Sequence, residues 1–165
     1  MLVVRYLALA ALVIWLGGMI VLGLLVAPSI FGVLQSATPD PAQGRMLAGA
    51  TFGEILRRFH LLAYGCGGVL VACLLVMKLV GPPPQTFFPR LGIVAVMLAI
   101  AVYSGVPVSR EIESIQSQVA GPISALPQSD ARRNRFDRLH GLSTTLMTIN
   151  MGLGLVLLYW YVREN

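Results

Sequence analysis

Charged residues are scarce in this sequence. Only 12% of the 165 residues are charged, about half the share usual in soluble domains, whereas 56% are hydrophobic. The longest polar stretch, residues 109–138, is too short for a separate catalytic domain. The net charge of +5 comes from basic residues that flank apolar stretches rather than from a basic module, so we do not expect nucleic acid as a partner.

Cysteines and catalytic motifs are also sparse. Cys66 and Cys73 are the only two cysteines, and a separation of seven residues on one helix places their Cα atoms about 10 Å apart, beyond the reach of a disulfide. The sequence contains no CxxC, HExxH, glycine-rich phosphate loop or nucleophile elbow. We therefore expect that the protein is not an enzyme and that it has no motif-defined metal site.

Four long apolar runs dominate what is present. They cover residues 6–27, 61–80, 91–108 and 142–162. Each has about the 17–25 residues that a helix needs to cross a bilayer, and Lys78 is the only charge within them. The first run is longer than the apolar part of a signal peptide, so we expect it to be retained. The sequence predicts an all-α fold: a polytopic membrane four-helix bundle forming a single domain over residues 1–165.

The distribution of Lys and Arg predicts the orientation. Four spans place both termini and the second loop on one side of the membrane, with Arg5, Lys78, Arg90 and Arg163. The other side has eight basic residues: Arg45, Arg57, Arg58, Arg110, Arg132, Arg133, Arg135 and Arg138. Because basic loops stay in the cytoplasm, we expect an inner-membrane protein with both termini outside the cytoplasm.

The two cytoplasmic connections should contain amphipathic helical extensions. Asp40 is a good N-cap and Pro41 a good first helical residue, so a helix should begin there, lie along the membrane surface and then turn into the second span. Residues 110–116 should continue the third span as a polar helix. Ser129 or Asp130 should cap the helix that leads into the fourth span.

Glycines mark the expected helix contacts. The residues are Gly17, Gly18 and Gly23 in the first span, Gly67 and Gly68 in the second, and Gly152 and Gly154 in the fourth. Small residues allow helix backbones to approach closely within a membrane. They can serve either the bundle itself or partner helices, and the sequence does not separate these uses.

A polar seam follows one face of the fourth span. It consists of His140, Ser143, Met147 and Asn150, which are three or four residues apart. Polar groups at membrane depth favour the bundle interior, so we expect Asn150 to hydrogen-bond a neighbouring helix.

His60 opens the second span from the same side as His140 and should lie at a similar depth. Pro28 and Pro107 should end the first and third spans there. Three interpretations of this edge remain open. The two histidines can form a structural hydrogen-bonded pair, they can ligate a haem, chlorin or metal such as copper, or the helix N-termini can bind an anionic lipid or a small anion.

Several motifs carry a family resemblance. They are Trp15-Leu-Gly-Gly-Met19, Val26-Ala27-Pro28 with Phe31, Ala48-Gly49 with Phe52, and Phe136-x-x-Leu139-His140-Gly-x-Ser143 with Asn150. Together they resemble the transmembrane-protein-205-like family of uncharacterised four-helix proteins. The resemblance implies a four-helix membrane fold but little chemistry, because that family is largely without an assigned function.

The function we expect is that of an accessory or scaffold subunit of a larger respiratory, photosynthetic or transport complex, with membrane lipid and protein partners. The different-class alternative is a stand-alone binder or carrier of a cofactor held by His60 and His140. The identity of any cofactor is not predicted.

Overall fold

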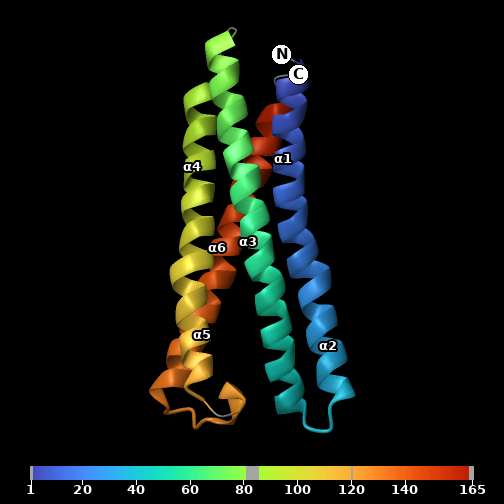
Figure 1. Cartoon of the computed structure of the whole chain (residues 1–165), viewed down its shortest axis with the longest axis vertical. Coiled ribbons are helices and arrows are strands. Elements are labelled where there is room, and N and C mark those ends of the chain that lie inside the picture. Colours follow the sequence, from blue (N-terminus) through green and yellow to red (C-terminus); the bar gives the residue numbers. More distant parts are fainter. Residues whose placement is uncertain (1, 81–85, 120, 164–165) are drawn as a thin grey trace.

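All regular structure in the described chain is helical. The computed structural model describes residues 2–80, 86–119 and 121–163, and these ranges contain no strand. Four helical units are long and apolar enough to cross a membrane: residues 2–37, 41–80, 87–117 and 131–163. Figure 1 shows them side by side. The predicted all-α fold of a polytopic membrane four-helix protein is confirmed.

Two of the four units contain a π turn, in which hydrogen bonds span five residues instead of four. The first unit consists of α1 (Leu2–Val21), a π turn (Leu22–Val26) and α2 (Ala27–Ala37). The second is one continuous helix, α3 (Pro41–Val80). The third consists of α4 (Phe87–Tyr103), a π turn (Ser104–Val108) and α5 (Ser109–Ser117). A short 3₁₀ turn (Ile123–Ala125) precedes the fourth unit, α6 (Ala131–Arg163).

The helix starts follow the predicted capping. Asp40 Oδ1 accepts a hydrogen bond from the backbone N–H of Ala42 at 2.9 Å, and α3 begins at Pro41. Asp130 Oδ1 accepts one from the backbone N–H of Arg132 at 2.8 Å, just before α6. The Arg132 side chain also hydrogen-bonds Asp130, which lowers the pKa of that carboxyl to about 2. The capping residue is therefore Asp130 rather than Ser129.

The core lies between α1, α3, α4 and α6. Helix α1 packs against α3 and α6, and α4 packs against the same two helices from the other side. The largest fully buried side chains are Trp15, Leu12, Leu70, Leu74, Met97, Leu157 and Val94. We call this part of the molecule, which includes the helix ends near both termini, the terminal half (Figure 1).

The remainder, which we call the loop half, consists of α2, α5 and the first parts of α3 and α6. Here α2 packs on α3 and α5 packs on α6, and the two pairs diverge in Figure 1. The contact between α2 and α3 is close at Gly44, where a Cβ would lie 2.8 Å from the Cα of Gln35. In contrast, no residue of α6 before Asn150 is buried.

One local prediction about the loop half is wrong. The segment from Pro41 does not lie along the surface and then turn, because α3 runs without a break to Val80. Residues 110–116 continue the third unit as a helix, as predicted. Pro28 and Pro107 lie inside continuous helical units. The π turns accommodate them: the N–H of Ala27 bonds the carbonyl of Leu22, and that of Ser109 bonds the carbonyl of Ser104.

The end of the bundle near the termini also gathers basic and aromatic residues. Lys78 Nζ lies 5.1 Å from the ring centre of Phe87. Arg90 is only 3% exposed, and its Nη2 donates to the carbonyl of Trp160 at 2.8 Å while its guanidinium lies 4.5 Å from the ring centre of Tyr161. The Lys78 contact joins α3 to α4, and the Arg90 contacts join α4 to α6.

Candidate functional site

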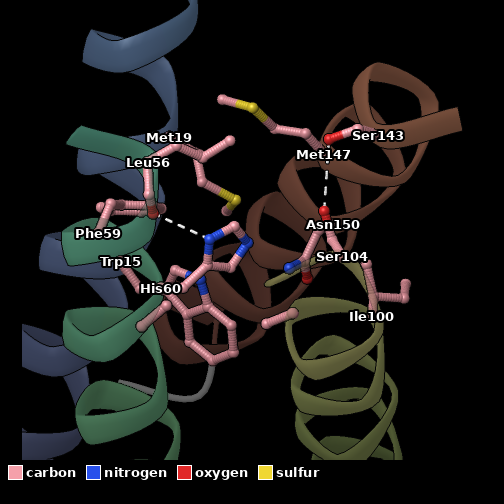
Figure 2. A pocket seen from close by; sticks show the side chains of 12 residues that line it. Trp15, Met19, Leu56, Phe59, His60, Ile100, Ser104, Ser143, Met147 and Asn150 are labelled. Carbon is pink, nitrogen blue, oxygen red and sulfur yellow. Dashed lines mark hydrogen bonds between the residues drawn. The ribbon is translucent and has the colours of Figure 1, made fainter. Parts of the chain in front are cut away.

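A small cavity lies where the terminal half meets the loop half. Its walls come from α1, α3, α4, α6 and the π turn Ser104–Val108, as Figure 2 shows. The cavity has a volume of about 30 Å³, which is room for one or two water molecules. Most of the wall is apolar, and its polar residues are His60, Ser104, Ser143 and Asn150. This cavity is the candidate site.

His60 is fixed in one orientation on the α3 side of the cavity. It is 8% exposed, and its Nδ1 lies 2.9 Å from the backbone carbonyl of Leu56. A carbonyl can only accept, so Nδ1 carries the proton in this hydrogen bond and the second ring nitrogen, Nε2, keeps its lone pair. Gly105 of the π turn lies against the ring, and a Cβ there would be 2.7 Å from His60 Cγ. Only a residue without a side chain fits beside the imidazole at position 105.

Asn150 lies on the α6 side and is 4% exposed. Its Nδ2 donates to the Met97 carbonyl at 3.4 Å, which agrees with the expected contact to a neighbouring helix. Its Oδ1 is buried and has no partner among the described residues. Such an acceptor costs free energy unless a guest in the cavity donates to it or carries positive charge.

The polar seam of α6 reaches this cavity in part. Ser143, Met147 and Asn150 all line it, and Ser143 Oγ is 3.4 Å from Ser104 Oγ on the facing π turn. Either hydroxyl can donate in this pair. The seam therefore places these three residues together, as expected from their spacing.

His140 lies elsewhere. It is exposed, does not line the cavity, and stacks on Phe136 with ring centres 6.2 Å apart and planes within 4°. At 100° per residue His140 is about 80° around α6 from Asn150, and α6 diverges from α3 toward this end. The structure does not bring the two histidines to one cavity. Among the described residues, no cluster of three or more His, Cys, Asp or Glu side chains could hold a metal ion.

Several basic residues near this edge pair with groups outside the cavity. Glu54 accepts hydrogen bonds from both Arg57 and Arg58, which lower its pKa to about 2. Arg135 pairs with Glu111 across α5 and α6. No charged side chain lines the cavity. A site for an anion at this position therefore has no cation to bind it.

The predicted packing glycines differ in how closely a neighbouring side chain approaches them. A Cβ at Gly18 would lie 3.2 Å from Phe59 Cζ, at Gly67 3.1 Å from Trp15 Cζ3, and at Gly154 3.2 Å from Leu16 Cδ1. Gly23 has an ordinary contact, with Met147 Cε at 3.6 Å. A Cβ at Gly17, Gly68 or Gly152 would meet nothing within 4 Å. Gly18, Gly67 and Gly154 therefore allow close packing within the bundle, whereas Gly17, Gly68 and Gly152 have open space beside them.

Sequence reasoning missed several cavity residues. Trp15, Met19 and Phe59 stand in apolar patterns that look like ordinary core, and nothing in their spacing connects them to His60. Ser104 offered a weak signal, since it is a polar residue in an apolar run shortly before Pro107.

Fold and site together define a multi-pass helical membrane protein with a small uncharged internal cavity. The chain belongs to the family with a domain of unknown function (DUF4149), whose model matches residues 10–120. The narrower likeness to the transmembrane-protein-205-like family stays a resemblance. No curated protein and no solved structure shows a significant match to the chain.

Proposed function

We propose that this protein is a non-enzymatic subunit that packs against helices of a larger membrane complex, respiratory, photosynthetic or transport in kind. The supporting observation is the outer face of α6. It carries Gly141, Thr145, Thr148 and Gly152 at helical spacing, and all four are exposed. Ser143, Met147, Asn150 and Gly154 occupy the opposite face, toward the bundle.

Such an outer face suits a protein neighbour better than lipid. Lipid tails gain nothing from glycine or threonine, whereas a partner helix can approach closely over glycine and hydrogen-bond a threonine hydroxyl. Thr145 Oγ1 donates to the Gly141 carbonyl at 2.9 Å and Thr148 Oγ1 to the Thr144 carbonyl at 3.0 Å. Each hydroxyl oxygen can still accept a hydrogen bond from a partner.

The experiment compares two glycines with open space beside them. After gentle solubilisation of native membranes, we expect the wild type to migrate in a complex well above its 17.7 kDa, together with defined partner chains. Gly152→Leu on α6 should release those partners, whereas Gly68→Leu on α3 should retain them. A wild type that migrates alone with lipid and detergent, or two variants that behave alike, would contradict the proposal.

The placement of His60 and His140 in different environments favours this subunit over the alternative of a haem, chlorin or copper carrier ligated by both histidines. Membrane lipid is the other expected partner, and nucleic acid is not expected.

The proposed topology places both termini outside the cytoplasm of an inner membrane, as the excess of basic residues in the loop half suggests. Ser36 and Ser124 are exposed at the loop end and offer sites for single cysteines. An impermeant thiol reagent should leave both unmodified in intact cells and label them after lysis. Rapid labelling in intact cells would reverse the orientation.

A further inference from the structure

We propose that the cavity binds a Cu(I) ion, with His60 Nε2 and the thioether sulfurs of Met19 and Met147 as ligands. The three residues come from α3, α1 and α6 and line the same cavity. Figure 2 shows the sulfur of Met19 beside the imidazole of His60, and Met147 extending from α6. The site differs from the histidine pair suggested by the sequence, because two methionines take the place of His140.

The His60 hydrogen bond prepares this residue as a ligand. Metal-binding histidines almost always donate their other ring N–H to a carbonyl or carboxylate, which fixes the tautomer and the direction of the free nitrogen. The contact of Nδ1 with the Leu56 carbonyl at 2.9 Å provides this arrangement. Gly105 packs closely against the ring, because a Cβ there would lie 2.7 Å from His60 Cγ, and this packing limits movement of the imidazole.

The two methionines select the kind of metal. Thioethers are soft ligands that favour Cu(I), whereas Mg²⁺ and Ca²⁺ prefer oxygen. Met19 is 2% exposed and Met147 is half-buried, and their flexible side chains can adjust to an ion. Met151, one turn along α6 from Met147, packs against the core without lining the cavity.

The lack of charged side chains in the cavity wall also favours Cu(I) over a divalent ion. The wall has no carboxylate, so a divalent ion would have no opposite charge to compensate it. A single positive charge is better tolerated in such a site. The available volume suits a bare ion rather than a macrocycle.

This inference goes beyond the proposed packing role, because the cavity and the partner face occupy opposite sides of α6. The full-length protein in detergent, under reducing and oxygen-free conditions, should retain one equivalent of Cu(I) against the chromophoric chelator bicinchoninate. Met147→Leu and Met19→Leu, which nearly conserve volume, should each lower the affinity about tenfold or more. Met151→Leu and His140→Gln are the matched controls and should leave it unchanged.

X-ray absorption at the copper edge provides a second measurement on the wild type alone. We expect one nitrogen and two sulfur neighbours, with the nitrogen signal lost in His60→Gln. Transfer of all copper to the chelator would show that the cavity holds only water and would overturn the proposal. Equal affinities for Met147→Leu and Met151→Leu, or a spectrum without sulfur, would overturn it as well, because the copper would then be bound elsewhere.

Discussion

The terminal half and the loop half are built from the same four helical units but are held together by different means. In the terminal half, wide side chains such as Trp15 and Leu70 are fully buried among α1, α3, α4 and α6. In the loop half, the buried apolar side chains are smaller or fewer, such as Ala48 and Ile115. They are accompanied by a close backbone approach at Gly44 and by ion pairs such as Arg135 with Glu111. The difference indicates that packing of large side chains stabilises one half, whereas contacts between pairs of neighbouring helices organise the other.

The largest expected effect comes from removing the central side chain of the terminal half. Trp15 is fully buried, so Trp15→Ala should lower the free energy of unfolding by about 3–5 kcal/mol. Phe136→Ala in the loop half removes a half-buried ring and should cost less than about 1 kcal/mol. Reversible unfolding in detergent measures both. Equal losses would remove the distinction between the halves.

A smaller effect should separate two adjacent glycines within the terminal half. A Cβ at Gly67 would lie 2.7 Å from Leu98 Cγ, so Gly67→Ala should destabilise by about 1–3 kcal/mol. Gly68 has open space beside it, and Gly68→Ala should be neutral or stabilise by up to about 1 kcal/mol through its higher helix propensity. The same unfolding assay applies. Equal losses for the two variants, or a larger loss for Gly68→Ala, would contradict the packing described.

The next prediction concerns the ion pair that joins α5 to α6. Arg135 is largely exposed and Glu111 partly exposed, so Arg135→Ala should change the global free energy of unfolding by less than about 1 kcal/mol. Hydrogen exchange of α5 amides should nevertheless accelerate, because local opening responds to local contacts. Arg138→Ala, at an exposed position without an ion pair to the described residues, is the control. Unchanged exchange in α5 would show that other contacts hold this helix.

The smallest effect should appear on acidification. Hydrogen bonds from Arg57 and Arg58 lower the pKa of Glu54 from 4.5 to about 2. A lowered folded-state pKa contributes stability above the unfolded pKa of 4.5, and this contribution is lost as the pH falls toward 2. NMR of labelled Glu54 should therefore show its carboxyl titrating near pH 2. Arg58→Gln should move the midpoint upward, and a wild-type midpoint near 4.5 would contradict the pairing.

The sequence predicted the helices better than their ends and faces. Length and hydropathy identify a membrane span, and Asp40 before Pro41 identifies a helix start, because both signals are local. The π turns near Pro28 and Pro107 left no such local signal, because a π turn is a small adjustment that depends on what surrounds it.

The site was harder to predict because it depends on rotation and divergence of helices. His60 and His140 both stand at the start of an apolar run, yet one lies in the cavity and the other is exposed. The neighbours of His60 come from α1, the π turn Ser104–Val108 and α6, far apart in the chain. For the same reason, the sequence could not predict that Gly67 is closely packed and Gly68 is not, because this depends on the rotation of α3 about its axis.

The unbroken helix α3 is longer than a membrane is thick. Its 40 residues span about 60 Å, twice the roughly 30 Å of a hydrocarbon layer, and its charged residues other than Lys78 lie in its first half. A helix of this length cannot lie wholly within the hydrocarbon layer, and its charged residues favour water, so the first half of α3 is the part that extends beyond the layer.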